Sequence, residues 1–202
     1  MEPNSPYSAS KAGGDLLCRA YHVTYKTPVI VTHSCNVYGP NQYPEKIIPL
    51  FVTNLIEGKK VPVYGDGQQV REWIYVLDHC RAIEAVLDGG VTGAVYNIGT
   101  RQRSTNLELT KLILALSDKD ESSIEHVADR AGHDVRYAIN PDKIMRELGW
   151  KPEVSFANGL EQTVRWYQQH PEWWKPLKSG EYKEYYKKQY AGRTAPAVAA
   201  NS

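Results

Sequence analysis

Tyr7 and Lys11 are the first residues of the chain whose types and spacing could carry out chemistry. Residues four positions apart lie on the same face of an α-helix, one turn from each other. A phenol is a weak base at neutral pH, and a nearby ammonium group favours its ionised form. A tyrosine in that setting can take a proton from an alcohol while a second group accepts the hydride. Taken alone, the same spacing is also typical of an ordinary exposed pair on a helix.

A helix must hold this pair, and the sequence predicts one over Tyr7–Lys26. Small or apolar residues recur there at close to helical spacing, although Gly13 and Gly14 each lower the helix propensity by about 1 kcal/mol. The β-branched run Val29–Thr32 then predicts a buried strand of a parallel sheet, and Asn36–Pro40 predicts a turn. The candidate pair therefore lies on a helix that leads into a sheet.

Helices and strands are expected to alternate along the rest of the chain, which predicts an α/β protein. Asp78 and Ser155 have the residue types of helix N-caps, and Thr105 with Glu108 has the spacing of a capping box. Strands are expected at 61–64, 73–76, 94–98 and 126–139, the last interrupted at 129–133. Helices are expected at 48–57, 78–90, 106–116, 140–149 and after 155. The helix after Thr105 is expected to bury Leu109, Leu112, Ile113 and Leu116.

The composition is that of an ordinary globular protein, with 42% of its 202 residues hydrophobic and 23% charged. The formal net charge of +1 gives no reason to expect nucleic acid or an anionic membrane as a partner. The apolar runs are far shorter than the roughly 20 residues that span a bilayer. Cys18, Cys35 and Cys80 form no metal-binding pair, so we expect no metal site and buried thiols in a cytoplasmic protein.

A phosphate-binding glycine loop is missing from the sequence. No Gly-x-Gly-x-x-Gly or Gly-x-x-Gly-x-x-Gly stretch follows an early strand, so there is no visible cradle for a dinucleotide. The chain also opens on a helix, without the strand–helix–strand units with which a doubly wound sheet begins. We therefore expect the second half of a larger fold.

The segments Pro6–Ala12 and Asn36–Pro40 together resemble the extended short-chain dehydrogenase/reductases. This resemblance implies that Tyr7 and Lys11 are catalytic, and that both contact NAD, with Lys11 on the nicotinamide ribose. It also implies a cofactor contact at the position of Val37. The implied fold is the carboxy-terminal part of such an enzyme, namely an incomplete Rossmann sheet with a small α/β substrate-binding domain.

Longer stretches narrow the resemblance to the dTDP-glucose 4,6-dehydratases of this family. These stretches are Pro44–Leu50, Gly65–Trp73, Ala128–Ala138 and the aromatic segment Trp173–Tyr186. The Asp-Arg-x-Gly-His pattern of Asp129–His133 discriminates most, because epimerases and decarboxylases of the superfamily resemble it less. The similarity covers about Pro3–Tyr190, which implies a Rossmann remnant at 1–45, a nucleotide-sugar-binding region interleaved with the last Rossmann elements at 46–190, and a disordered tail at 191–202.

The resemblance also implies which residues contact the nucleotide sugar. By position, Asn36 would hold the sugar-phosphate region, and Lys46 and Ile47 would flank the way in to the site. The base and deoxyribose pocket would be lined by Pro62, Val63 and Tyr64, and Arg71 would pair with the diphosphate. The residues that would close over the nucleotide are Asn106, Asp129, Arg130, Ala131, Gly132 and His133. A guanidinium group suits the geometry of phosphate oxygens.

Each of these residues has a plainer alternative. Arg71 could be a solvated arginine of a strand, Asn106 only part of a helix start, Tyr64 ordinary core and His133 a loop residue without a ligand. Glu45 and Glu72, which lie nearby in the sequence, are interpreted as structural or solvated.

Three features depart from the family pattern. Val37 stands where many members have asparagine, and Ala131 replaces the usual proline, which loosens that loop. The Asp and Glu that protonate the C6 hydroxyl and remove the C5 proton lie ahead of the tyrosine in the family, whereas only six residues precede Tyr7 here. The chain is therefore expected to be inactive, or nearly so, by itself.

The implied reaction is the conversion of dTDP-glucose to dTDP-4-keto-6-deoxyglucose, with NAD as an internal redox cofactor. Oxidation at C4 acidifies the C5 proton, water leaves across C5 and C6, and the hydride returns to C6. One alternative is a non-catalytic remnant that binds a dTDP-sugar or a homologous subunit. Another is a UDP-sugar epimerase or decarboxylase. Family members are typically homodimers.

Overall fold

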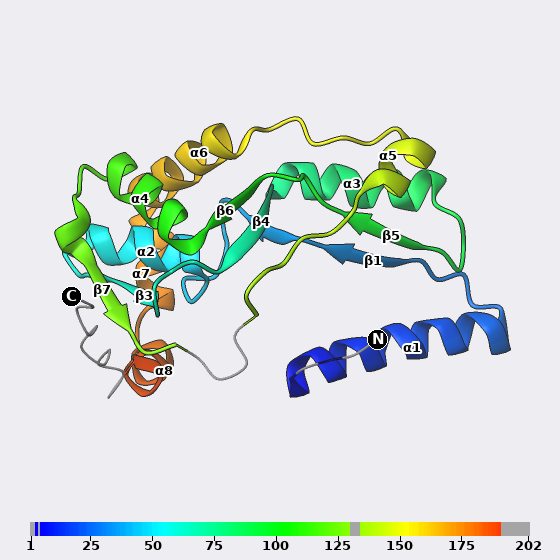
Figure 1. The fold of residues 1–202 in the computed structure, drawn as a ribbon, viewed down its shortest axis with the longest axis horizontal. Coiled ribbons are helices and arrows are strands. Elements are labelled where there is room, and N and C mark those ends of the chain that lie inside the picture. The colour runs from blue at the N-terminus through cyan, green and yellow to red at the C-terminus, as the bar shows by residue number, and fades with distance from the viewer. Residues whose placement is uncertain (1–2, 4, 130–133, 191–202) are drawn as a thin grey trace, which may run out of the picture. The chain divides into compact units, whose positions relative to one another are not determined.

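The computed structural model describes residue 3, residues 5–129 and residues 134–190 (Figure 1). Helices alternate with strands that pair in parallel, which confirms the predicted α/β class. The chain forms two compact units, each assembled from three stretches of sequence. Unit 1 consists of Met1–Val37, Glu72–Arg103 and Tyr137–Val154, and unit 2 of Tyr38–Arg71, Ser104–Arg136 and Ser155–Ser202.

Unit 1 is built around two parallel strands, β1 (Val31–Ser34) and β5 (Val95–Ile98), with Thr32 opposite Tyr96. Side chains alternate between the two faces of a strand. Tyr96 and Ile98 therefore point to one face, where they join a buried core, whereas Val95 points to the other. Its helices are α1 (Pro6–Tyr25), α3 (Val76–Gly89) and α5 (Asp142–Leu148).

The core of unit 1 lies on the face of the sheet that α3 and α5 cover. Ala82 and Val86 of α3 and Ile144 of α5 pack there, and Trp150 closes the cluster. By contrast, α1 lies against the opposite face and buries none of its 20 residues. The helix that carries Tyr7 and Lys11 is thus the least buried long element of this unit.

Unit 2 contains a second parallel pair, β3 (Val61–Tyr64) with β7 (Ile124–Val127). Its central helix is α2 (Ile47–Ile56), which is buried over eight consecutive residues, Ile48–Leu55. The remaining elements of unit 2 are α4 (Asn106–Leu116), the short 3-10 helix η1 (Glu121–Ser123), α6 (Phe156–Gln169), α7 (Pro171–Leu177) and α8 (Glu181–Tyr190).

Three further strands carry the chain from one unit to the other. These are β2 (Asn36–Tyr38), β4 (Val70–Tyr75) and β6 (Arg103–Thr105). β4 runs directly into α3 without a loop. Compared with the strand predicted at 73–76, the observed strand begins three residues earlier and ends one residue earlier. The predicted division into 1–45 and 46–190 stays a prediction.

The caps predicted from local sequence are confirmed where the capping residues are close in the chain. Thr105 and Glu108 form the complete capping box of α4, and the Ser155 hydroxyl accepts a hydrogen bond from Asn158 N–H at the start of α6. The prediction that Asp78 caps a helix is wrong, because α3 begins two residues earlier. Asp78 is fully buried and instead accepts hydrogen bonds from the backbone of Glu153 and Val154.

Two other sequence predictions need correction. Leu112 does not join the buried face of α4, since it is 44% exposed and Leu114 is buried in its place. The strand expected at 126–139 is confined to β7, and beyond the undescribed residues only an isolated bridge joins Val70 and Arg136. The predicted tail at 191–202 lies outside the described residues.

The three cysteines are free thiols with different surroundings. Cys35 is buried, and its burial raises the pKa of the thiol to about 12, which keeps it protonated. Cys80 is exposed and Cys18 is half-buried, so the expectation of buried thiols is correct for Cys35 only. No helix in the described part of the chain is both long enough and apolar enough to cross a membrane.

Candidate active site

Tyr7 and Lys11 lie on the first turns of α1, where local sequence fixes the start of the helix. The Ser5 hydroxyl accepts a hydrogen bond from the Ser8 N–H at 3.1 Å. Pro6 occupies the first helical position, which needs no N–H donor. From this start, Lys11 Nζ lies 5.8 Å from the centroid of the Tyr7 ring. The phenol and the ammonium group are therefore side by side on one helix face, as their spacing predicts.

The pair borders an open hollow in which two further polar residues take part. Asp15 follows Lys11 by one more turn of α1, and its Oδ2 lies 2.8 Å from Nε2 of His33 in β1. This contact ties the face of α1 that carries Tyr7 to the strand beneath it. Sequence reasoning missed both residues, although the regular spacing of Tyr7, Lys11 and Asp15 was visible. The lining of the hollow consists of Pro3, Tyr7, Ser8, Lys11, Ala12, Asp15 and His33.

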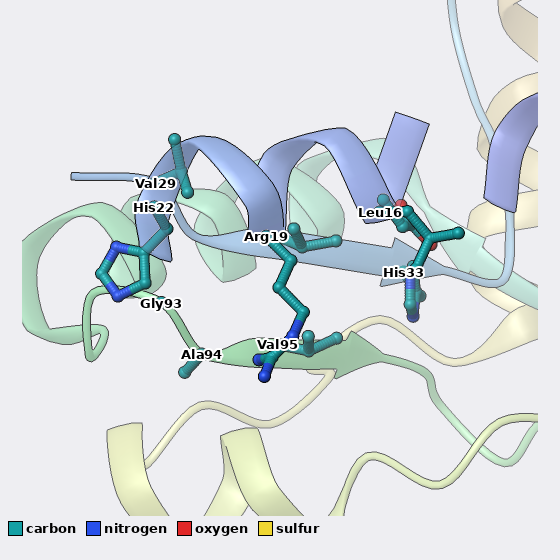
Figure 2. A pocket seen from close by; sticks show the side chains of 10 residues that line it. Leu16, Arg19, His22, Val29, His33, Gly93, Ala94 and Val95 are labelled. Carbon is teal, nitrogen blue, oxygen red and sulfur yellow. The ribbon is translucent and has the colours of Figure 1, made fainter. Parts of the chain in front are cut away.

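Farther along α1, a small cavity of about 110 Å³ separates the helix from β1 and β5 (Figure 2). The Arg19 side chain extends from α1 across the cavity toward Val95. At the end of the helix, the His22 ring fits against Gly93, where any Cβ would come within 2.3 Å of the ring. His22 Nδ1 also lies 2.9 Å from the carbonyl oxygen of Thr27. Polar contacts, rather than a buried apolar face, thus hold α1 in place.

Asn36 and Val37 follow β1 in the same unit, and both are half-buried in β2. Val37 packs against the core cluster that contains Cys35 and Ile74. Its side chain therefore contributes to the hydrophobic core. The backbone remains the part of Val37 that could contact a cofactor.

The residues predicted to flank the way in lie at the start of α2, and those predicted to line the base and deoxyribose pocket lie on β3, all in unit 2. Lys46 precedes α2 and pairs with Glu45 at 2.7 Å, and both are exposed, so Glu45 is solvated as expected. Ile47 is half-buried at the first position of α2. Pro62 and Val63 are buried in β3, whereas Tyr64 at the end of the strand is half-buried. Among the strand residues, Tyr64 is thus the one whose side chain is accessible to a ligand.

A polar network joins two of the residues expected to close over the nucleotide. Gln69, which sequence reasoning missed, donates from Nε2 to Asp129 Oδ2 at 3.0 Å and accepts from Asn106 Nδ2 at 3.3 Å. The backbone N–H of Asn106 also donates to the Gln69 carbonyl at 3.0 Å. The structure therefore brings Asn106 and Asp129 together through a third side chain. Asn106 does open α4, but it is buried and has this additional role.

Arg71 is only 6% exposed, so the alternative of a solvated strand arginine is wrong. Its two terminal nitrogens donate to the carbonyl oxygens of Val70 and Asp134, both at 2.8 Å. These bonds fix the plane of the guanidinium group. Glu72, its neighbour, is fully buried and accepts hydrogen bonds from the backbone of Thr100 and Arg101, so it is structural.

Four of the predicted contact residues, Arg130, Ala131, Gly132 and His133, lie outside the described residues. Tyr7, Lys11 and Asn36 belong to unit 1, whereas the described base-pocket and diphosphate residues belong to unit 2. Among the residues that the structure describes, no three His, Cys, Asp or Glu side chains are grouped so as to hold a metal ion.

The family of the chain follows from its similarity to known proteins. The family model described as GDP-mannose 4,6 dehydratase matches residues 1–163. The chain belongs to this GDP-mannose 4,6 dehydratase family. Its sequence relatives within the family include several dTDP-glucose 4,6-dehydratases. The one from Streptomyces niveus is 53% identical over 179 residues, which cover 89% of this chain and 53% of the relative.

A second relative, dTDP-glucose 4,6-dehydratase 1 of Escherichia coli, is 47% identical over 95% of this chain and 55% of its own length. The predicted resemblance to dTDP-glucose 4,6-dehydratases is thus confirmed. The chain spans about half the length of the curated relatives that it matches.

Solved structures agree with the family assignment. The dTDP-glucose 4,6-dehydratase DesIV of Streptomyces venezuelae, solved with NAD bound, has a TM-score of 0.87 and 57% identity over 88% of this chain and 55% of DesIV. UDP-glucose 4-epimerase of Thermotoga maritima, solved with UDP-glucose, has a TM-score of 0.79 but only 29% identity over 84% of this chain and 55% of the epimerase. The predicted α/β fold, covering about half of an extended short-chain dehydrogenase/reductase, is therefore confirmed.

Proposed function

We propose that this chain supplies the proton-transfer pair and the nucleotide-sugar pocket of a dTDP-glucose 4,6-dehydratase. Such an enzyme is a lyase that converts dTDP-glucose to dTDP-4-keto-6-deoxyglucose. The observation that carries the proposal is the placement of Tyr7 and Lys11 side by side at the edge of an open hollow. The identity of 47–54% to enzymes of this name supports it.

Tyr7 would act as the base that takes the proton from the C4 hydroxyl of the glucose. The Lys11 ammonium group, 5.8 Å from the centroid of the Tyr7 ring, would attract the negative charge that develops on the phenol as the proton is transferred. Tyr7 is 69% exposed, so a sugar can reach its hydroxyl group directly.

The same pair fits the nicotinamide ribose of NAD. An ammonium group carries three N–H donors, and Lys11 can direct them to the two ribose hydroxyls from the exposed face of α1. NAD, when bound, would accept the hydride from the sugar and later return it. The fit extends only to this end of the cofactor, because the chain has no glycine-rich loop for the phosphates.

Unit 2 would hold the nucleotide. Tyr64, half-buried at the end of β3, would be the residue of this strand that packs on a thymine, with the buried Pro62 and Val63 beneath it as its support. Arg71, with its guanidinium plane fixed by two carbonyl groups, would face the diphosphate. The network around Gln69 would orient Asn106 for contact with the nucleotide.

Calorimetric titration of the 202-residue chain with dTDP and with UDP tests this pocket. dTDP differs from UDP by the thymine methyl group and by the absence of the ribose 2′-hydroxyl. One methyl group in an apolar pocket already changes affinity by about 10-fold or more, so we expect dTDP to bind at least 10-fold tighter than UDP. If neither dTDP nor UDP binds, the proposal is overturned. Tighter binding of UDP would instead support a UDP-sugar epimerase or decarboxylase.

A turnover assay separates the enzyme from a remnant. With NAD and dTDP-glucose, we expect the 202 residues alone to form no 4-keto product, because the Asp and Glu expected for dehydration are not among them. Binding of dTDP without turnover is also what a non-catalytic remnant would show. Supplying the glycine-rich loop, the acid and the base on the amino-terminal half of a relative would then restore turnover only if this chain is part of an enzyme. In that case Tyr7→Phe should abolish the restored activity.

A further inference from the structure

The last helix of the described residues, α8, carries tyrosines four positions apart. Tyr182, Tyr186 and Tyr190 therefore share one helix face, which we call the tyrosine row. Neighbouring rings in the row have centroids 6.3 Å and 4.6 Å apart. Burial raises the pKa of all three phenols, so they remain neutral and can pack against apolar surface. Tyr185, on another face of the same helix, is 48% exposed.

The first two members of the row attach α8 to the segment around α2. The Tyr182 hydroxyl donates to the carbonyl oxygen of Pro44 at 3.1 Å, and its ring packs edge-on against Tyr43. The Tyr186 hydroxyl accepts a hydrogen bond from Asn54 Nδ2 at 3.2 Å. This end of the row thus adjoins the segment that leads into Lys46 and Ile47.

The other end of α8 contacts Tyr64, the residue of β3 assigned to the base pocket. The Tyr190 ring stacks on the Tyr64 ring, with centroids 6.1 Å apart and planes at 26°. Gln189 Nε2 donates to the Tyr64 hydroxyl at 3.0 Å. Tyr64 is therefore held both at its ring and at its hydroxyl group by adjacent residues of α8.

The start of α8 is fixed independently of Gln189 and Tyr190. Lys178, three residues before α8, is only 6% exposed. Its Nζ lies 3.0 Å from each of three acceptors on or next to α2, namely Thr53 Oγ1, Asn54 Oδ1 and Glu57 Oε2. Changes at the far end of the helix therefore leave its anchor intact.

We propose that Gln189 and Tyr190 are positioning residues that hold Tyr64 in place and thereby help the pocket to select dTDP over UDP. The inference rests on the proposed function, because Tyr64 is a pocket residue only if a nucleotide binds there. A side chain that is already held in one conformation loses less freedom when a ligand packs on it, and only thymine has a methyl group that can pack on the fixed Tyr64 ring. The tyrosine row connects this end of the pocket to the segment at Lys46 and Ile47.

Titration of the full chain with dTDP and UDP, in the wild type and in variants, tests this role. We expect Tyr190→Ala to weaken dTDP binding about 10-fold and to reduce the ratio of dTDP to UDP affinity. Tyr190→Phe keeps the ring but loses the hydroxyl group that hydrogen-bonds Tyr64, so it should reduce the ratio less than Tyr190→Ala does. Gln189→Ala should reduce the ratio to a smaller extent. Tyr185→Ala is the matched control on the same helix and should leave both affinities unchanged.

The ratio distinguishes positioning from a general structural role. A variant that only loosens the fold weakens both nucleotides equally and leaves the ratio as it was, and the urea midpoint of each variant reports such loosening directly. An unchanged ratio in both Tyr190→Ala and Gln189→Ala, with normal binding by the wild type, would overturn this inference alone. Failure of the wild type to bind dTDP would overturn the proposed function and this inference with it.

Discussion

Glu72 shows how one buried charge can organise a loop. Its Oε1 accepts from the backbone N–H groups of Thr100 and Arg101 at 2.8 Å and 3.0 Å. Its Oε2 lies 3.4 Å from Arg103 Nε. The fit is close, because a Cβ on Gly99 would come within 2.5 Å of the same carboxylate. The carboxylate thus replaces water for N–H groups that folding removes from solvent.

Removing the Glu72 carboxylate should destabilise the folded protein. We expect Glu72→Ala to lower the free energy of unfolding by about 3 kcal/mol, because it leaves buried N–H donors and a cation without their acceptor. Urea unfolding followed by circular dichroism measures the change. Glu161→Ala, on the surface of α6, serves as control and should change stability by less than about 0.5 kcal/mol. A loss below about 1 kcal/mol for Glu72→Ala would contradict this account.

At the scale of single elements, the start of α4 matters because Asn106 is its first residue. The Thr105 hydroxyl accepts from Glu108 N–H at 3.0 Å, and Glu108 Oε2 accepts from Thr105 N–H at 2.7 Å. Both hydrogen bonds of the capping box join residues that are three positions apart in the sequence. The helix start, and with it the position of Asn106, is therefore fixed by local sequence.

Breaking the capping box should lower the free energy of unfolding by a modest amount, most of which a substitution that keeps the hydroxyl group should retain. Thr105→Ala is expected to destabilise the protein by about 1 kcal/mol, since one backbone N–H loses its acceptor. Thr105→Ser keeps a hydroxyl and should retain most of that stability. Guanidinium unfolding of the three proteins compares them. Equal midpoints for Thr105→Ala and Thr105→Ser would show that the cap contributes nothing.

The contact between α2 and the residue after α7 makes stability depend on pH. Burial would raise the pKa of Glu57, but hydrogen bonds from Lys59 and Lys178 outweigh it, so the pKa lies below its ordinary value of 4.5. A carboxylate whose pKa is lower in the folded state stabilises the fold above the unfolded value. That stabilisation is lost as the pH falls through the folded value.

The stability of the wild type and of Glu57→Gln can be compared by urea unfolding between about pH 7 and about pH 3. We expect the variant to be less stable near neutral pH, and the difference in urea midpoint to shrink as the pH falls below about 4.5. Glu161→Gln, which changes a half-buried glutamate of α6 that pairs with Arg165, controls for general acid effects. A difference that stays constant across this range would contradict the assigned role of Glu57.

At the scale of the whole molecule, the exposed face of α1 carries a row of large apolar side chains. Leu17, Tyr21 and Tyr25 follow one another at helical spacing, and each is more than half exposed. The rings of Tyr21 and Tyr25 lie 5.4 Å apart. Contiguous apolar surface of this kind marks an association site.

We therefore expect the chain to self-associate through α1. Sedimentation equilibrium should give an average mass above that of the 22.8 kDa monomer, rising with concentration. Leu17→Glu should shift the distribution toward monomer, since a charge in an apolar contact is costly. Leu87→Glu, at a residue of α3 that is 77% exposed, is the control and should have little effect. A monomeric wild type at all concentrations would refute this expectation.

The local sequence by itself determined the features that depend on residues close in the chain. The pair of Tyr7 and Lys11, the capping box at Thr105 and the cap at Ser155 were all predictable, because each rests on a spacing of three or four residues. The α/β class followed from the alternation of apolar patterns, and the family from motifs that the resemblance recognised. Periodicity and short spacings are properties of the chain before it folds.

Only the tertiary structure decided which distant residues meet. Asp78 was mistaken for a cap because its true partners lie 75 and 76 residues farther on. Gln69 reaches Asp129 across 60 positions, and His33 reaches Asp15 across 18. No local pattern encodes such contacts, since they depend on how the strands and helices pack. The sequence thus determined which groups are available for chemistry, and packing decided which of them are neighbours.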